Sequence, residues 1–198
     1  PSPMKIDFLL SIRESQAVRL NEKFTDKIDL SITTTLSKMA CGGIYDQVGG
    51  GFFRYSVDSQ WQVPHFEKML YDNALLLSTY SRAYQRFKKP IFKKVVEQTV
   101  EWLYQKMADK DGGYFSSVSA DSDEGEGEYY LWKYVEIEEI LGSMDATQFA
   151  EAYGISQEGN FESDKSLPVR KNQSEQEILL YKELEKKLLK NRENKTEP

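Results

Sequence analysis

The sequence predicts an all-α protein in which pairs of helices are joined by short β-hairpins. Long stretches place apolar residues three and four positions apart, the spacing of a buried helix face, and glycine-rich segments interrupt them. The segments GGGFFRYS and GGYFSSVS begin alike about sixty positions apart, which indicates a repeated helix–loop–helix unit. We therefore expect a helical array with short hairpins at one end.

Length and composition limit what the chain can do. Its 198 residues suffice for one core, and a net charge of −6 argues against a nucleic-acid partner, which normally requires a basic face. Cys41 is the only cysteine and His65 the only histidine, so a disulfide within the chain and a cysteine-based zinc site are excluded. There is no apolar run of membrane-spanning length and no signal-peptide pattern, so we expect no membrane partner and a cytoplasmic protein.

The first part of the chain contains one weak and one stronger helical pattern. Residues 5–24 scatter apolar positions among charges, whereas residues 28–39 repeat them at helical spacing. Asp26 is expected to cap this second helix and Gly42-Gly43 to end it. Residues 44–63, with three consecutive glycines, predict a short hairpin or a long loop.

The clearest helical pattern begins directly after Pro64 and runs to Phe87. Proline is favoured in the first turn of a helix, and Glu67 suits the positive end of the helix dipole. A second helix is expected from Pro90 to Met107, ended by the turn at Asp111.

The remaining elements are shorter. Residues 114–119 and 129–132 are expected to pair as antiparallel strands around an acidic loop, followed by short helices over residues 134–141 and 145–153. Residues 174–190 form a highly charged helix whose apolar positions require a partner.

His65 is the first candidate for chemistry. We expect it at the start of a helix that follows a long loop, close in sequence to Glu67 and Asp72. An imidazole in that position could act as an acid or a base near neutral pH. The alternative is a structural histidine that hydrogen-bonds the backbone of the loop.

Other polar residues of the same region are candidates for ligand binding. Arg54 and Tyr55 could reach hydroxyl or carboxylate groups of a ligand, because arginine binds anionic groups in a bidentate manner. Alternatively, they could tie the hairpin to Asp58 or Asp46. Asn73 falls on the apolar stripe of its helix, so it either lines a cavity or hydrogen-bonds a loop carbonyl.

The chain is also rich in aromatic residues, with three tryptophans, twelve tyrosines and ten phenylalanines. Aromatic walls that face a polar groove are common in carbohydrate sites, and aromatic residues are equally common in helical cores. Trp61, which lies between the glycine-rich segment and His65, is the tryptophan that we assign to substrate binding.

Two segments resemble metal or phosphate sites but fail the spacing tests. Counted from Asp121, the sixth and twelfth positions of the acidic loop hold Glu126 and Trp132 rather than the glycine and glutamate of an EF-hand. The triple glycine lacks the Gly-Lys-Ser/Thr of a phosphate loop. We therefore expect no metal and no cofactor.

Three motifs resemble a known family: GGIYDQVGGGFFRYSVDSQWQVPHFEKMLYDNALLL, DGGYFSSVSADSDEGEGEYYLW and YGISQEGNFE. From Ile28 to Glu162 the chain is similar to the thioredoxin-domain family that includes spermatogenesis-associated protein 20. The resemblance implies a parent protein with an N-terminal thioredoxin-like domain, which would be a partner within the same chain. It further implies a large α/α toroid similar to N-acylglucosamine 2-epimerases and six-hairpin glycosidases.

The resemblance implies three regions here. Residues 1–25 would be a helical lead-in from a missing thioredoxin-like domain, residues 26–162 the first part of the α/α toroid, and residues 163–198 a charged C-terminal helix. No Cys-x-x-Cys occurs, so we expect the redox domain to be absent and the toroid to be incomplete in this fragment. The exposed apolar helix faces of an incomplete ring would favour a homodimer.

The family motif, carried over onto this sequence, marks Asp46, Arg54, Tyr55, His65, Phe66, Glu67, Asp72 and Asn73. In the epimerase-like relatives the cavity lies at the centre of the ring, and the helix after Pro64 would be an inner one. Phe53 stands where many relatives have a histidine, which removes one acid or base partner of His65.

We therefore expect a domain that acts on a sugar-like small molecule by epimerisation, isomerisation or hydrolysis, with this chain alone inactive. The catalytic candidates are His65, Glu67 and Asp72, and the substrate-binding candidates are Asp46, Arg54, Tyr55, Trp61 and Asn73. Epimerisation needs two groups with near-neutral pKa values, and hydrolysis needs two carboxylates that flank the bond. The alternative is a non-catalytic helical module that binds a ligand or docks clients for a redox domain.

Overall fold

The computed structural model describes residues 2–19, 21–161 and 164–198, which are mostly helical, as the sequence predicts. The helices are α1 (Pro3–Arg13), α2 (Gln16–Arg19), α3 (Glu22–Cys41), α4 (Leu70–Phe87), α5 (Pro90–Trp102), a π-helical turn (Leu103–Met107), α6 (Tyr134–Leu141), α7 (Ser143–Tyr153) and α8 (Glu175–Arg192). Within the described ranges, no helix is both long and apolar enough to cross a membrane.

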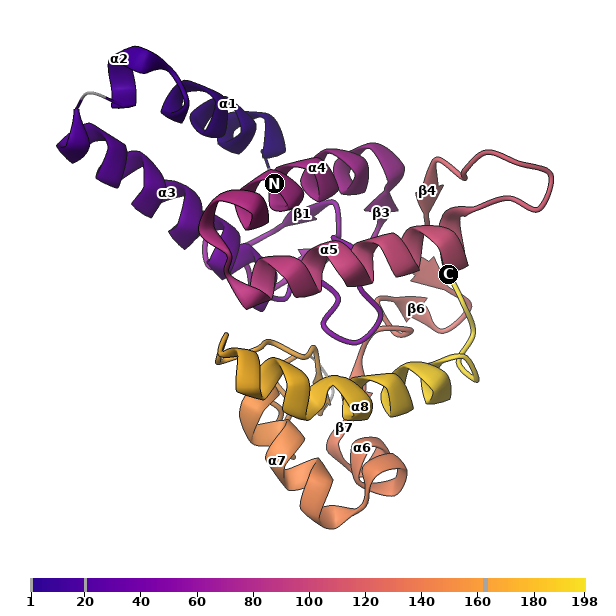
Figure 1. Cartoon of the computed structure of the whole chain (residues 1–198). Coiled ribbons are helices and arrows are strands. Elements are labelled where there is room, and N and C mark those ends of the chain that lie inside the picture. Colours follow the sequence, from indigo (N-terminus) through magenta and orange to yellow (C-terminus); the bar gives the residue numbers. More distant parts are fainter. Residues whose placement is uncertain (1, 20, 162–163) are drawn as a thin grey trace.

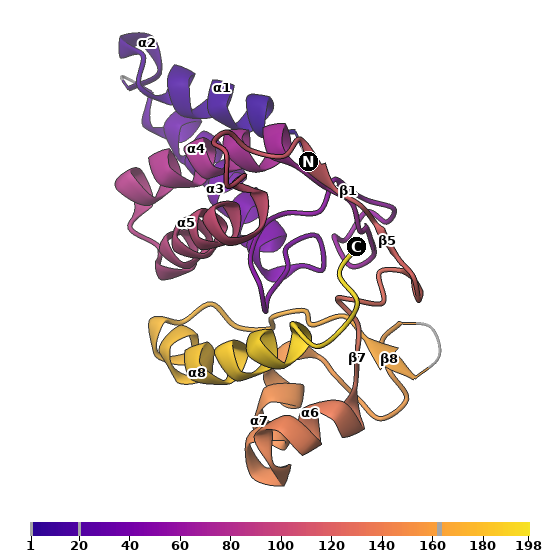
Figure 2. The ribbon, with the colours of Figure 1, turned by 90° about the vertical axis from the view of Figure 1, so that its right-hand side faces the viewer.

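Helix α8 lies between two groups of helices (Figure 1). On one side α5 packs against α3 and α4, which α1 covers from outside; on the other side α6 and α7 pack against each other and against α8. Figure 2, a view turned by 90°, shows the same order. Ile178 of α8 joins the core of the first group, and Tyr181 and Leu188 join the core of the second. The charged C-terminal helix thus has the partners that its apolar positions require.

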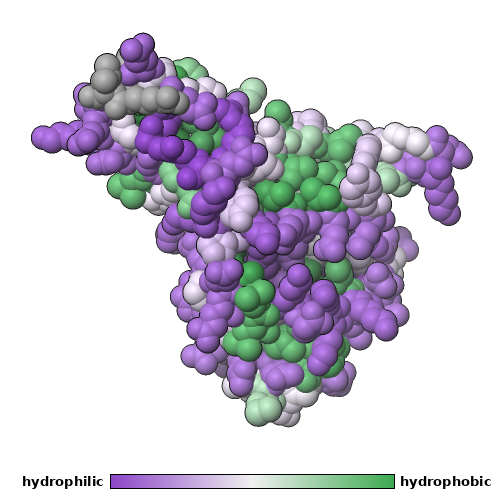
Figure 3. Space-filling model, viewed as in Figure 1, coloured by the Kyte–Doolittle hydropathy of each residue, from purple (hydrophilic) through white to green (hydrophobic). Residues whose placement is uncertain are grey.

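Two larger cores belong to these groups of helices, and a third apolar cluster lies under the loops. The third cluster contains Phe53, Phe66, Tyr130 and Leu167. Its rings lock loop segments to one another; the ring centroids of Phe53 and Phe66, for example, are 5.2 Å apart. On the face shown in Figure 3, apolar patches interrupt the polar surface over the first group of helices and again over the region of α8.

The N-terminal helices differ in their bounds from the prediction. Residues 5–24 contribute α1, α2 and the start of α3, which begins at Glu22. Asn21, not Asp26, caps α3: its side chain accepts a hydrogen bond from the backbone N–H of Phe24 at 3.2 Å. The predicted cap was wrong because an extended residue with a suitable side chain already occurs five positions earlier.

The strands form antiparallel pairs of two residues each: β1 (Tyr55–Ser56) with β2 (Pro64–His65), β3 (Lys68–Met69) with β4 (Ser117–Val118), β5 (Asp121–Ser122) with β6 (Gly125–Glu126), and β7 (Trp132–Lys133) with β8 (Lys165–Ser166). Of the short hairpin or long loop predicted over residues 44–63, the structure shows a hairpin whose first strand, β1, lies in that range and whose second strand, β2, lies just beyond it.

The helix predicted to begin directly after Pro64 begins at Leu70 instead. Residues 64–69 are extended, because β2 and β3 pair with strands from elsewhere in the chain. Burial alternates along this segment: Phe66 and Lys68 are buried, whereas His65 and Glu67 are half-buried. The apolar residues from Phe66 onward also fit the spacing of a helix. The alternation with a period of two, which is typical of an extended strand, was therefore not recognised in the sequence.

The hairpin predicted from residues 114–119 and 129–132 is also wrong. Strand β4 pairs with β3, and β7 pairs with β8. Residues 129–131 instead turn back, with the N–H of Tyr130 bonded to the carbonyl of Gly127 at 2.8 Å, and their side chains fill the third apolar cluster. The two short helices that follow, α6 and α7, agree with the prediction.

Candidate functional site

The extended segment from Pro64 to Met69 presents two chemically different faces. Neighbouring side chains of an extended chain point to opposite sides, so His65 and Glu67 share one side and Phe66 and Lys68 the other. His65 and Glu67 meet three other polar residues, Arg54, Tyr55 and Glu126, and we call these five residues the outer cluster. On the opposite side Lys68 meets Asp46 and Arg192, and we call these three residues the inner cluster.

The outer cluster gathers a histidine, two carboxylates and an arginine near the surface. His65 Nδ1 lies 2.8 Å from Glu126 Oε1, and its Nε2 lies 3.8 Å from Glu67 Oε2. Arg54 donates to the same Glu67 oxygen at 2.6 Å. The imidazole stacks on the ring of Tyr55 with centroids 5.0 Å apart. His65 therefore contacts carboxylates, as a general acid or base would, and among the described residues its ring makes no hydrogen bond to the loop backbone.

The three predicted catalytic residues do not form one group. Asp72 is buried in the first turn of α4, where burial raises the pKa of its carboxyl group. Among the described residues, no hydrogen bond or ion pair joins Asp72 to His65 or Glu67. The structure thus places His65 beside Glu67 and adds Glu126, whose role in the cluster was not predicted.

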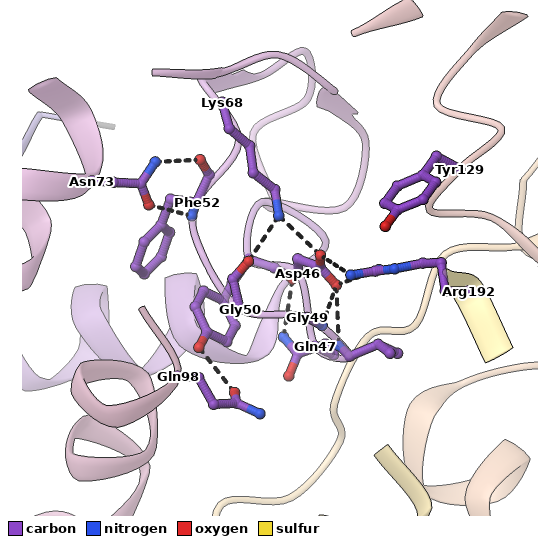
Figure 4. A network of polar contacts seen from close by, with 12 residues as sticks. Asp46, Gln47, Gly49, Gly50, Phe52, Lys68, Asn73, Gln98, Tyr129 and Arg192 are labelled. Carbon is purple, nitrogen blue, oxygen red and sulfur yellow. Dashed lines mark hydrogen bonds and ion pairs between the residues drawn. The ribbon is translucent and has the colours of Figure 1, made fainter. Parts of the chain in front are cut away.

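The inner cluster is a buried ion triad (Figure 4). Lys68 Nζ lies 2.9 Å from Asp46 Oδ2, and the Arg192 guanidinium binds both oxygens of Asp46 at 3.0 and 2.9 Å. The backbone N–H groups of Val48 and Gly49 also donate to Asp46. All three ionised residues are at most 4% exposed. Asp46 was predicted to bind a substrate; here its oxygens are occupied by protein donors.

Burial and pairing set the electrostatics of this triad. Burial would raise the pKa of Asp46, but the Arg192 and Lys68 cations keep it well below its usual range. Burial lowers the pKa of Lys68 to about 8, even though Asp46 opposes this shift. Lys68 Nζ also donates to the carbonyl of Gly50 at 2.7 Å. Two cations share one carboxylate, so the triad retains an excess positive charge away from water.

The triple glycine makes this arrangement sterically possible. A Cβ atom on Gly49 would lie 1.8 Å from Arg192 Nη2, and one on Gly51 would lie 2.8 Å from the Trp102 ring. Any larger residue at position 49 would therefore displace the guanidinium from Asp46. The glycine-rich segment thus lies between α5 and the end of α8, and because its glycines have no side chains both helices can pack closely against it.

A cavity of about 220 Å³ opens beside the inner cluster, and we call it the inner cavity. Lys68 and Arg192 line it together with the rings of Trp102, Tyr129 and Tyr130. Cation–π contacts hold these groups in place: Lys68 Nζ is 4.8 Å from the Tyr130 centroid, and the Arg192 guanidinium is 4.9 Å from that of Tyr129. Aromatic faces and buried hydrogen-bond donors thus meet in one small space.

The remaining predicted binding residues have other contacts. Asn73 accepts from the N–H of Phe52 at 2.6 Å and donates to the carbonyls of Phe52 and Met69, which agrees with the alternative of a loop hydrogen bond. Trp61 packs against the first core and is not among the residues that line the inner cavity. Arg54 and Tyr55 lie in the outer cluster. The Asp58 carboxylate accepts a hydrogen bond from the backbone N–H of Val63 in its own loop. Phe66 belongs to the third apolar cluster.

A second buried polar group connects α5, α7 and α8. Glu185 accepts from Arg170 at 2.6 Å and from the hydroxyl of Tyr153, and it lies 3.3 Å from Lys94 Nζ. Gln98 extends this group to the hydroxyl of Tyr45 in the glycine-rich segment. It borders a groove of about 680 Å³ between α5 and α8. Lys94 and Arg170 share the single carboxylate of Glu185, and because these contacts join separate parts of the fold we interpret the group as structural.

Sequence reasoning missed the residues that build the inner cavity. Lys68 could have been found, because strict alternation in His-Phe-Glu-Lys predicts an inward lysine if the segment is read as a strand. Arg192 gave no signal, since it is one of many charges in the last helix. Its role depends on a contact between residues 146 positions apart.

Comparisons with known proteins identify relatives of this chain. No family model matches it. It is 35% identical over 175 residues to human spermatogenesis-associated protein 20, an alignment that covers 81% of this chain and 22% of the human protein. It is 34% identical over 180 residues to the mouse protein of that name and 39% identical over 151 residues to an uncharacterized protein of Caenorhabditis elegans. The chain spans about a fifth of the length of these relatives.

Proposed function

We propose that the chain forms part of an α/α toroid and that its inner cavity binds a sugar-like small molecule. The observation that carries the proposal is the wall of the cavity, where Trp102, Tyr129 and Tyr130 lie beside the buried donors Lys68 and Arg192. Ligand sites of proteins typically combine an apolar or aromatic lining with a few placed polar groups. A sugar has both an apolar C–H face and a rim of hydroxyl groups, so it suits such a wall.

The donors of the cavity are held in position before any ligand arrives. Lys68 is fixed by Asp46 and by the Gly50 carbonyl, and Arg192 by two bonds to Asp46. Side chains that are already held by supporting contacts lose little conformational entropy when a ligand binds. This preorganisation favours binding as the role of the inner cavity, whether or not a reaction follows.

Tryptophan fluorescence tests the proposal directly. We expect a titration of the 198-residue chain with monosaccharides to change its emission, because Trp102 lines the inner cavity. The change should disappear in Trp102→Phe and persist in the matched variant Trp61→Phe, since Trp61 lies elsewhere. If no sugar changes the emission, or if Trp61→Phe removes the response instead, binding in the inner cavity is wrong.

A second candidate function is acid–base catalysis at the outer cluster. The observation that favours it is the position of His65 between Glu126 and Glu67, with part of the ring exposed. A carboxylate partner orients an imidazole and stabilises its protonated form, as in many general acids and bases. The first substrate classes to test are sugars that epimerise beside a carbonyl group, and hydrolysis of a glycosidic bond comes next.

The catalytic candidate requires a longer protein that contains this chain, together with the thioredoxin-like domain that we propose as its partner. Turnover of small sugars by that protein should fall at least tenfold in His65→Ala, and His65→Gln should give the same loss if proton transfer is the role. Equal turnover in the variants, or none in any form, would leave the alternative of a non-catalytic binding or docking module for the redox domain.

The cytoplasmic location and the homodimer remain predictions of the sequence. Exposed apolar residues such as Leu30, Leu179 and Leu180 offer helix faces for self-association. Light scattering after size-exclusion chromatography should give twice the chain mass if the faces pair. A monomer at all concentrations would contradict this.

A further inference from the structure

The charged side chains around the inner cavity are mostly cationic. Lys68, Lys106 and Arg192 line it, and Glu197 is the only side-chain carboxylate among the lining residues. Asp46 lies behind Lys68 and Arg192, and its negative charge compensates one of their two positive charges. Pro198, which carries the terminal carboxylate of the 198-residue chain, also lines the cavity, so three positive groups face three negative ones in a chain whose total is −6. The cavity is therefore less negative than the chain as a whole.

Glu197 already places a carboxylate at this cavity. Its Oε1 is ion-paired with Lys106 Nζ and lies 3.5 Å from the hydroxyl of Tyr129. The side chain of Glu197 is half-exposed, so this pair is weak and can be replaced by another anion. Glu197 thus occupies the position that an acidic ligand group would take between a lysine and a tyrosine hydroxyl.

We infer that the inner cavity selects sugar acids, with the ligand carboxylate replacing that of Glu197 beside Lys106. This inference rests on the proposed function, because it specifies which sugar-like molecules the same cavity takes. The aromatic wall would contact the ring of the sugar, and Lys106 and Tyr129 would bind its carboxylate. Neutral sugars of the same size lack the charge-assisted bonds and would bind more weakly.

The test compares D-glucuronate with D-glucose, which differ only in a carboxylate at carbon 6. We expect the 198-residue chain to bind glucuronate about tenfold more tightly than glucose in calorimetric titrations, since a hydrogen bond to a charged group is worth that much. If neither sugar binds, the proposed function fails. If both bind equally, the proposed function stands and the selection of sugar acids is wrong.

Two rim variants separate the proposed position from other sites. Lys106→Gln should weaken glucuronate binding about fivefold and leave glucose unaffected, and Glu197→Gln should strengthen it by up to about fivefold by removing the competing carboxylate. Lys110→Gln and Glu124→Gln change the same charges on exposed residues outside the cavity and should have no effect. Equal effects of rim and control variants would overturn the assignment, because they would report only the net charge of the chain.

Discussion

Glu67 and Lys68 are neighbours in the chain, yet they belong to clusters of opposite character. In the outer cluster Glu67 binds Arg54 and His65 in contact with water, and every side chain keeps some exposure. In the inner cluster Lys68 binds Asp46 without access to water, and Arg192 completes the triad. The comparison indicates that burial separates charges that are enclosed within the fold from charges that stay in contact with water. A motif that looks continuous in sequence can therefore divide between two environments.

The largest difference between the clusters should appear when their carboxylates are neutralised. Asp46→Asn leaves two buried cations without a counter-charge, so we expect the free energy of unfolding to fall by about 3–5 kcal/mol. Glu67→Gln, its counterpart in the outer cluster, should cost about 1 kcal/mol or less. Urea unfolding followed by circular dichroism measures both. Similar losses in the two variants would show that the inner triad is no more important to the fold than a surface pair.

A smaller loss is expected from Gly49→Ala, because the added methyl group would overlap Arg192 Nη2. Displacing that guanidinium leaves buried charged groups unsatisfied, at a cost of about 2–3 kcal/mol. The loss should nearly vanish when Arg192→Met is already present, since the clash partner is then gone. A double-mutant cycle in urea measures this coupling. Additive losses would contradict the steric explanation.

The inner cluster should also make stability depend on pH. Lys68 has a pKa of about 8 instead of 10.5, so above pH 8 the folded chain releases a proton that the unfolded chain still holds. The free energy of unfolding should therefore rise between pH 8 and 9, by at most about 1.4 kcal/mol per pH unit for this lysine. Lys94, whose burial likewise lowers its pKa to about 8, acts in the same sense.

The matched measurement is the same pH series on Lys68→Met, in which the contributions of the other lysines with a lowered pKa, Lys94 and Lys195, should remain. The series stops at pH 9 because the buried thiol of Cys41, with its pKa raised to about 11 from 9.0, has the opposite effect above that value. An unchanged slope in the variant would mean that Lys68 does not cause the rise.

The smallest effect is expected at the outer cluster. His65→Gln removes one partner of Glu126 at a partly exposed site, so the free energy of unfolding should change by less than about 1 kcal/mol. Thermal unfolding at neutral pH is sufficient to detect it. A loss as large as that of Asp46→Asn would assign His65 to the fold and would remove the contrast between the clusters.

Sequence reasoning predicted those parts of the fold that depend on local periodicity. Helices α5, α6, α7 and α8 follow apolar spacing and the positions of Pro90 and glycine, so they were found with small errors in their bounds. The start of α4 was missed because a pattern that begins at Phe66 fits both a helix and a strand, and the pairing of β2 with the nearby β1 and of β3 with the distant β4 decided between them.

The candidate site was predicted less completely. His65 and Glu67 lie near each other in the structure as they do in the sequence, whereas the other partner of His65, Glu126, comes from the acidic loop 61 positions away. Asp46 was singled out, but its partners Lys68 and Arg192 were not. Asn73 illustrates the limit: a polar residue on an apolar stripe signals importance, and only the fold shows that it bonds the Phe52 backbone.

The bond between Arg192 and Asp46 also has a kinetic consequence. It joins residues 146 positions apart, so closing the loop between them costs more entropy than pairing within a local segment, and this delays its formation. Asp46 and Lys68 come from one local segment and can pair early. The arrival of α8 would then be a late step on the folding pathway, and the inner cavity would exist only in molecules that have completed it.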